Sequence, residues 1–233
     1  MKVISFKLWG DFAHFRRFDT TTSPLTYSIP PPSSLRGLIG AILGFSSSEY
    51  PEVFNSVNAA IGIKSIGPIR KTRLSINYLN TKDGAWITAP PKKDMHTQIR
   101  IEFLKNPAYV IYFSHRSEKI MEELKKRLTE HKPFYTPYLG ISECIAEFKY
   151  IEEKEFKKTS GKVATSCAFR KEFLEKIPIG EGTGFFIERM PIALDRDRNL
   201  IDIADVIFPV DGNPIPVILK EAWQSDGEII YLF

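Results

Sequence analysis

The chain has 233 residues, of which 43% are hydrophobic and 26% charged, a balance that excludes an intrinsically disordered or fibrous protein. No stretch approaches the roughly 20 continuous apolar residues that span a bilayer, so we expect a cytoplasmic protein. The two cysteines have no CxxC spacing and favour neither a disulfide framework nor a cysteine-rich zinc site. The net charge is +4, but residues 199–233 hold six acids against one lysine, so the earlier part carries the positive excess, which suggests an anionic partner or unevenly distributed solvated charge.

The first part of the chain predicts a strand, a long loop and a helix. Residues 2–9 alternate in polarity as a strand does, and a loop with adjacent arginines and three consecutive prolines follows at residues 10–32. Ser33 or Ser34 is then placed to cap a helix that extends through residue 43. Three small residues in this helix allow close approach of a neighbouring backbone: Gly37, Gly40 and Ala41.

The complete series of elements predicts an α+β fold. After the first strand and helix, the predicted elements are a short helix at 51–60, strands at 61–69, 70–79, 98–104 and 108–114, a helix that starts at Ser114 or Ser117 and includes Leu128, and a strand at 142–151. With the excursion at about 80–98 set aside, the order is βαββαβ, the ferredoxin-like arrangement that RNA-recognition modules share. We therefore expect a domain over residues 1–150 with an insertion at about 80–98, and a small β-rich part over residues 151–233.

Three sequence blocks carry a resemblance to a known family. The blocks are GDFAHFRRF after the first strand, PPSSLRGLIGAILG at the first helix and, more loosely, PYLGISEC at residues 137–144. Together they resemble the Cas five family of CRISPR-associated RAMP proteins. The match is good over residues 1–44, loose over 133–151, and rests on position alone for the excursion, which corresponds to the family's thumb-like insertion.

The resemblance implies a role in antiviral defence. In that family the protein is a subunit of a type I interference complex, Cascade, that binds the 5′ handle of crRNA and contacts the backbone subunit and the large subunit. It implies no enzymatic activity in most subtypes, no cofactor, no metal and no small-molecule substrate. A protein-interaction module without RNA contact is a further alternative, which would dock through the acidic C-terminal part and the glycine-containing helix.

Several groups of residues are candidates for RNA binding. Guanidinium groups contact phosphates in pairs of hydrogen bonds, and a helix N-terminus attracts anions; solvated surface charge and simple helix capping are the alternatives. An aromatic in the excursion suits base stacking, or else anchors a hairpin. The candidates are Arg16 and Arg17 after the first strand, Ser33, Ser34 and Arg36 at the helix, the stripe of Arg70, Lys71 and Arg73, Trp86, Lys92 and Lys93 in the excursion, and Tyr138.

A ribonuclease is the alternative function. One branch of the family cleaves pre-crRNA without a metal, because attack by a 2′-hydroxyl needs only a base, an acid and a cation. The corresponding groups here are Tyr27, His115 and Arg116. The adjacent Lys-His pair of that branch is missing, so we expect a protein that is not an enzyme.

Overall fold

A four-stranded antiparallel sheet organises the N-terminal part of the protein. The computed structural model describes residues 1–79, 96–177 and 184–233. The sheet has the order β3-β6-β1-β7, and each pair of neighbours is antiparallel. Its strands are β1 (Lys2–Trp9), β3 (Ala59–Ser65), β6 (Ala108–His115) and β7 (Glu147–Glu155).

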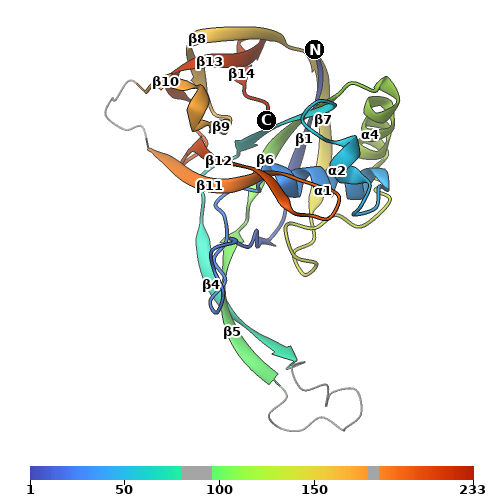
Figure 1. The fold of residues 1–233 in the computed structure, drawn as a ribbon, viewed down its shortest axis with the longest axis vertical. Coiled ribbons are helices and arrows are strands. Elements are labelled where there is room, and N and C mark those ends of the chain that lie inside the picture. Colours follow the sequence, from blue (N-terminus) through green and yellow to red (C-terminus); the bar gives the residue numbers. More distant parts are fainter. Residues whose placement is uncertain (80–95, 178–183) are drawn as a thin grey trace.

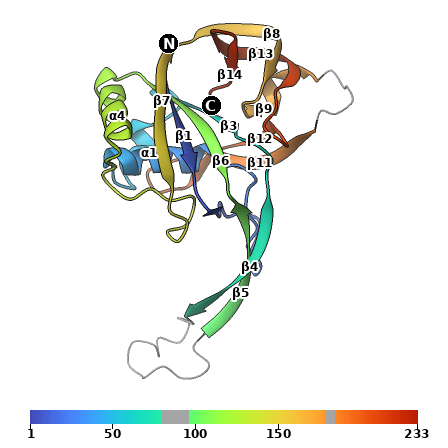
Figure 2. The same ribbon diagram turned by 180° about the vertical axis from the view of Figure 1, so that it is seen from behind.

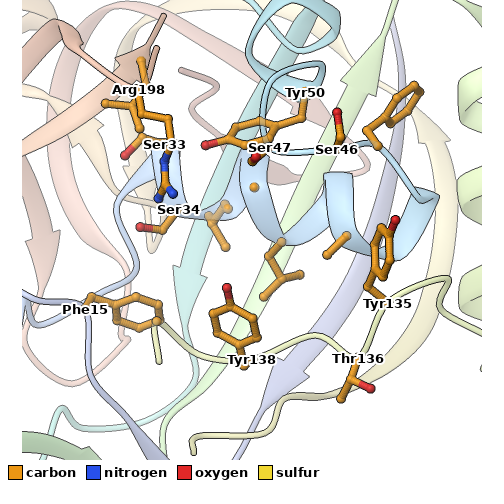
Figure 3. Close-up of a pocket in the computed structure, with 17 residues that line it drawn as sticks. Phe15, Ser33, Ser34, Ser46, Ser47, Tyr50, Tyr135, Thr136, Tyr138 and Arg198 are labelled. Carbon is orange, nitrogen blue, oxygen red and sulfur yellow. The ribbon is translucent and has the colours of Figure 1, made fainter. Parts of the chain in front are cut away.

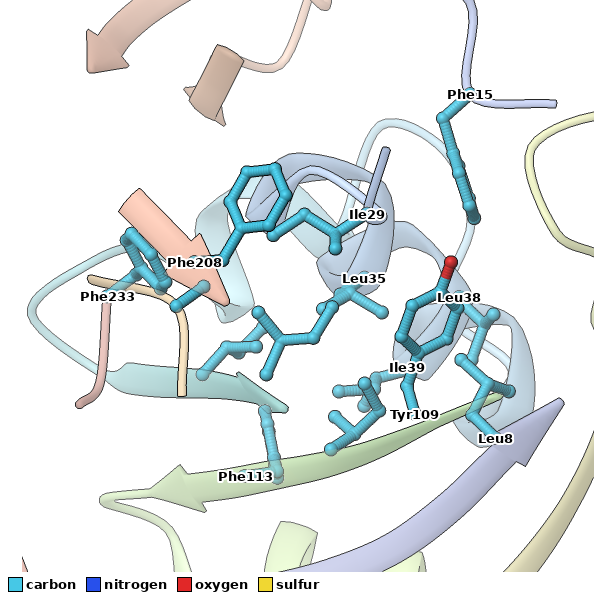
Figure 4. Close-up of a cluster of buried hydrophobic side chains, with 14 of the residues drawn as sticks. Leu8, Phe15, Ile29, Leu35, Leu38, Ile39, Tyr109, Phe113, Phe208 and Phe233 are labelled. Atoms are coloured by element: carbon cyan, nitrogen blue, oxygen red, sulfur yellow. The ribbon is translucent and has the colours of Figure 1, made fainter. Parts of the chain in front are cut away.

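Two helices follow strands of this sheet and cover one of its faces (Figure 1). Helix α1 (Pro32–Leu43) lies between β1 and β3 in the chain, and α4 (Glu118–Glu130) lies between β6 and β7. Alternation along β1 turns Ile4, Phe6 and Leu8 towards the helices. Leu35 and Ile39, one helical turn apart, pack into the same core (Figure 4). Each fully buried side chain of this kind stabilises the fold by about 1.5–3 kcal/mol.

Helix α1 begins differently from the prediction. Its N-cap residue is Pro31, whose carbonyl accepts hydrogen bonds from the N–H groups of Ser34 and Leu35, and no side chain caps the helix. The helix ends as expected at Gly44, where φ is +91° and the N–H donates to the carbonyl of Gly40 over 2.8 Å. The prolines before the helix thus fix its start, and the serines are available for other contacts.

The predicted helix at 51–60 is shorter than expected. Helix α2 is confined to Tyr50–Val53. The side-chain carbonyl of Asn55 accepts hydrogen bonds from the N–H groups of Val57 and Asn58 at 3.0 Å, which closes a turn in place of a further helical turn. The chain then enters β3 two residues earlier than predicted.

A long hairpin projects from the body of the molecule (Figures 1 and 2). Its strands are β4 (Lys71–Leu79) and β5 (His96–Lys105), and the short strand β2 (Phe12–Ala13) pairs with the base of β5. This arm begins earlier and ends later than the insertion predicted at about 80–98. Most of that predicted insertion lies outside the described residues.

The C-terminal part is built from short antiparallel strands. One sheet contains β8 (Lys157–Thr165), β10 (Leu174–Lys176), β13 (Ile215–Ser225) and β14 (Glu228–Ile230), and a second contains β9 (Phe169–Arg170), β11 (Phe185–Leu194) and β12 (Leu200–Pro209), with a 3-10 turn η1 at Lys171–Phe173. Met190, Ile192 and Phe208 belong to the same buried cluster as β1 and α1. Strand β7 crosses the expected boundary at residue 150, and the division into two domains stays a prediction. Among the described residues, no helix is long and apolar enough to cross a membrane.

Candidate nucleic-acid interface

The connection between α4 and β7 docks against the loop that follows β1. The N–H of His14 donates to the carbonyl of Leu139 over 3.0 Å. Gly140 has φ +92°, and a Cβ at this position would collide with the carbonyl of His14. A Cβ at Gly10 would come within 2.8 Å of the carbonyl oxygen of Ile145. The sequence blocks around residues 10–18 and 137–144 therefore lie side by side, and two glycines permit their contact.

The same connection continues along the end of α1. Phe134 and Tyr135 donate backbone hydrogen bonds to the carbonyls of Ile42 and Ala41 over 2.9 and 3.0 Å. The ring of Phe134 occupies the space that a side chain at Gly44 would need. Residues 134–140 thus form one wall of a groove along α1.

This groove, which we call the α1 groove, has a volume of about 540 Å³ (Figure 3), within the range of ligand-binding clefts. Its floor contains small residues of α1, among them Gly37 and Ala41, and its walls carry aromatic rings, hydroxyls and one guanidinium. The lining residues that matter here are Phe15, Ser34, Gly37, Ala41, Tyr50, Tyr135, Tyr138 and Arg198.

The lining of the α1 groove suits flat rings that carry anionic groups. Tyr135 and Tyr138 are 50% and 48% exposed, so their rings are available for stacking. Arg198 lies in the turn between β11 and β12 with φ +64°, and in Figure 3 its guanidinium lies beside Ser34. Burial raises the pKa of Tyr50, so its phenol stays neutral and remains a hydrogen-bond donor at neutral pH.

The predicted residues around the start of α1 differ in their exposure and contacts. Both serines line the groove, but Ser34 is exposed, whereas Ser33 is buried and donates a hydrogen bond to the carbonyl of Pro191 over 3.1 Å. Tyr138 lines the groove as well. Tyr50, Tyr135 and Arg198 line it too, and no local sequence pattern pointed to Tyr50 or Arg198.

Arg36 does not lie at a surface that RNA could reach. It is 3% exposed, and its guanidinium donates hydrogen bonds to the carbonyls of Ile192 and Phe233. Burial, with a smaller effect of nearby Arg170, lowers the pKa of Arg36 to about 10. The residue remains charged at neutral pH and joins α1 to β11 and the C-terminus, so its assignment to RNA binding is corrected.

The predicted arginines after β1 lie at the base of the arm. Arg16 is exposed and donates to the carbonyl of Thr20 over 3.2 Å. Arg17 forms a two-pronged ion pair with Asp19 at 3.1 and 3.0 Å, and its guanidinium lies 5.9 Å from the ring centre of Tyr27. Arg16 is thus the more available cation of the two.

The predicted cationic stripe continues from this loop onto β4. The register places Lys71 and Arg73 on one face of the arm. Lys71 lies 3.3 Å from a carboxylate oxygen of Glu102 and Arg73 lies 3.9 Å from the other. Glu188 approaches Lys71 to 3.9 Å. These acids offset much of the stripe's charge, whereas Arg70 is exposed.

Trp86, Lys92 and Lys93 lie outside the described residues. Their assignment to RNA binding stays a prediction. No cluster of three or more metal-binding side chains occurs within residues 1–79, 96–177 and 184–233.

The groups named for ribonuclease chemistry do not come together. Tyr27 is 1% exposed and hydrogen-bonded to Phe15 beyond the end of β1, whereas His115 pairs with Ala59 beside the start of that strand. At about 3.3 Å per residue, the length of β1 separates them by on the order of 20 Å. Burial raises the pKa of Tyr27 to about 12, which makes it a poor base at neutral pH.

The histidine of this set already has a structural role. Nε2 of His115 lies 3.0 Å from the carbonyl of Val53, and Nδ1 accepts a hydrogen bond from the N–H of Ser117 at 2.9 Å. Arg116 is exposed and shares no contact with Tyr27 in the described structure. The predicted catalytic set is therefore wrong as a set, because Tyr27 lies at the opposite end of the sheet from His115 and Arg116.

Comparison with known proteins points to one family. The family model described as "CRISPR-associated protein (Cas_Cas5)" matches residues 3–197. A protein of Saccharolobus solfataricus named "CRISPR system aCascade subunit Cas5 1" is 25% identical, with 95% of this chain and 94% of that protein covered. A chain of a solved "CRISPR RNA-guided surveillance complex" is 12% identical, with 91% of each chain covered and a TM-score of 0.57.

A further relative bears on catalysis. The Thermus thermophilus protein named "CRISPR pre-crRNA endoribonuclease Cas5d" is 27% identical, with 64% of this chain covered. The match also spans 64% of that relative's length, which is just under two thirds. Since this relative is named as an enzyme, the comparison contradicts the prediction that the protein is not an enzyme, and that prediction is corrected.

Proposed function

From the membership of this chain in the Cas5 family of CRISPR-associated proteins, shown by the match over residues 3–197, we propose that it is a subunit of a type I Cascade complex in the cytoplasm and binds the 5′ handle of crRNA. The observation that carries the proposal is the α1 groove, with exposed tyrosine rings on one wall and a guanidinium at the other. The names of two relatives, a Cascade subunit and a pre-crRNA endoribonuclease, support an RNA of the CRISPR system as the ligand.

Single-stranded RNA fits the α1 groove better than a duplex does. Unpaired bases stack on aromatic rings, whereas the bases of an A-form duplex are stacked on one another. Tyr135 and Tyr138 offer two rings three residues apart along one connection. Serine hydroxyls and the guanidinium of Arg198 then meet sugar and phosphate groups, as in other single-strand binding sites.

The base of the arm supplies further cations for the RNA backbone. Arg16 and Arg70 are exposed and lie on neighbouring segments, since β2 and the following loop contact β5 beside β4. We expect both to contact phosphates, whereas Lys71 and Arg73 pair with Glu102 on the neighbouring strand of the arm, and Lys71 also approaches Glu188 on β11. We assign Lys71 and Arg73 a structural role because each of them already has an acidic partner.

We also infer that the sheet has the ferredoxin-like arrangement. The strand order β3-β6-β1-β7 and the positions of α1 and α4 in the chain correspond to the βαββαβ series with its second and fourth strands at the edges of the sheet. Contacts with the backbone and large subunits are part of the proposal. Exposed apolar residues on β11 and β12, including Ile187 and Ile201, which are 48% and 64% exposed, are available for them.

Cleavage of pre-crRNA is a second candidate function, because a relative is named for it. Tyr27 and His115 cannot act on one phosphate while the sheet is intact, so cleavage would use other groups. A direct test is incubation with the repeat RNA in EDTA, followed by a denaturing gel. A specific cleavage product that persists in a His115→Ala variant would support cleavage and confirm that the predicted set does not perform it.

The binding proposal is tested by affinity for repeat RNA that ends in the 5′ handle. Tyr138→Ala and Arg198→Gln should each weaken binding, by roughly fivefold or more for the loss of one stacked ring. Arg189→Gln is the matched control, because Arg189 is exposed on the neighbouring strand β11 and lies outside the groove. Equal affinities for wild type, Tyr138→Ala and Arg198→Gln would contradict the proposal.

A further inference from the structure

The sheet has a second face, opposite the helices, and the C-terminal strands cover only part of it. Val3 and Tyr112 point to this face and pack with Phe156, Cys167 and Ile230 in a separate buried cluster. The hydroxyl of Tyr112 donates a hydrogen bond to Glu228 over 2.5 Å. The cover thus ends near the middle of β6, where Val110 is only partly buried.

Beyond this cover, three lysines lie in one row across the sheet. Val110 pairs with Lys64 on β3 and with Lys7 on β1, and Lys7 pairs with Lys149 on β7. Residues directly opposite one another in antiparallel strands point to the same face. Lys149 is exposed, and Lys7 and Lys64 are half-buried. We call these three residues the lysine row.

No direct ion pair to the lysine row is present in the described part of the chain. Like charges directly opposite each other, as at Lys7 and Lys149, destabilise a sheet. Among the described residues, no carboxylate lies within 4.0 Å of any of the three ammonium groups. Of the acids on the adjacent rows, Glu152 lies 2.9 Å from Lys154, and Glu147 lies 3.5 Å from His131, which is charged only when protonated.

An aromatic ring adjoins the lysine row on the same face. Trp9 follows Lys7 by two residues on β1, and it is half-exposed. The ammonium of Lys7 lies 4.9 Å from the centre of the indole ring, within the range of a cation–π contact. A cationic surface with a ring available for stacking is the combination that proteins use to bind single strands without sequence preference.

We propose that the lysine row and Trp9 form a second binding surface, for the backbone and bases of a single-stranded nucleic acid, distinct from the α1 groove. At about 4.8 Å between neighbouring strands, the three lysines span roughly 15 Å. This spread suits a polyanion with regularly spaced charges rather than one isolated anion. The surface lies on the opposite side of the sheet from α1, so it is available while the groove holds the handle, and it does not depend on that proposed role.

The test measures affinity for a fluorescently labelled oligouridine, which lacks any handle sequence, over a series of salt concentrations. For single strands each phosphate contact contributes about 0.7 to the slope of log affinity against log salt. The double variant Lys7→Gln/Lys149→Gln should therefore reduce the slope by about 1.4 and weaken binding at low salt. Lys119→Gln/Lys126→Gln on α4 is the matched control, because it removes two exposed lysines from the other side of the sheet.

The ring is tested separately from the charges. Trp9→Ala should weaken oligouridine binding roughly fivefold or more without a change in the salt slope, and Trp9→Phe, which keeps a stacking ring, should recover most of that loss. If Lys7→Gln/Lys149→Gln retains the affinity and slope of its control, the proposal is overturned. It is equally overturned if that variant loses affinity for polyglutamate but not for oligouridine, because the surface would then bind acidic protein.

Discussion

Gly140 offers the sharpest test of how the α1 groove is held together. A non-glycine residue at φ +92° costs about 1–2 kcal/mol in backbone strain. At this position the new Cβ would also collide with the carbonyl of His14. Because the carbonyl belongs to the backbone, it cannot move aside as a flexible side chain would. Displacing the connection would also break the hydrogen bond from His14 to Leu139, worth about 1 kcal/mol. We therefore expect Gly140→Ala to lower the free energy of unfolding by about 3–4 kcal/mol.

Gly161 provides a matched control for the strain alone. Its φ is +94°, and a Cβ there would meet no atom within 4 Å. Gly161→Ala should therefore cost only about 1–2 kcal/mol. For a domain of this size, each kcal/mol shifts Tm by about 2–4 °C, so Gly140→Ala should melt clearly below Gly161→Ala when unfolding is followed by circular dichroism. Equal losses of Tm in the two variants would refute the contact between residues 14 and 140.

Two further predictions concern buried polar groups. Arg36→Met should lower Tm by several degrees, because the carbonyls of Ile192 and Phe233 lose their hydrogen-bond donor. The RNA affinity of the folded protein should not change. A loss of affinity without a loss of Tm would contradict this prediction. Burial lowers the pKa of His14 below its ordinary value of 6.5, so the unfolded chain takes up a proton first and stability is lost as pH falls below about 6.5. Urea unfolding at pH 7 and pH 5 should show this loss of stability. The variant His14→Asn, which keeps a hydrogen-bond donor towards Glu102, should lose less stability between the two pH values. An equal loss in the variant would exclude His14 as the source of the pH dependence.

Local sequence patterns were sufficient to predict the elements of the sheet and both of its helices. Alternation in residues 2–9 predicted β1, and the prediction of a helix that extends through residue 43 matches the end of α1. These signals depend only on neighbours along the chain. The start of α1 was predicted less well, because a serine cap was expected. In the structure Pro31 is the N-cap residue, its carbonyl accepts the first hydrogen bonds of the helix, and no side chain caps it.

The site needed information that lies far apart in the sequence. Arg36 is buried by contacts with Ile192 and Phe233, which lie more than 150 residues away in the sequence. Glu102 is brought beside Lys71 and Arg73 only by the register of β4 and β5. The α1 groove draws Arg198 from a turn between two C-terminal strands, and no local pattern connects that residue with Tyr138.

The most direct test of the central claim is crosslinking of the bound 5′ handle to the protein. Repeat RNA that carries photoreactive uridines in the handle would be bound and irradiated, and the modified peptides identified by mass spectrometry. The account predicts crosslinks to Tyr135, Tyr138 or the turn that contains Arg198, and their loss in Tyr138→Ala. Handle crosslinks confined to the C-terminal sheet of β8, β13 and β14, with none in the α1 groove, would contradict it.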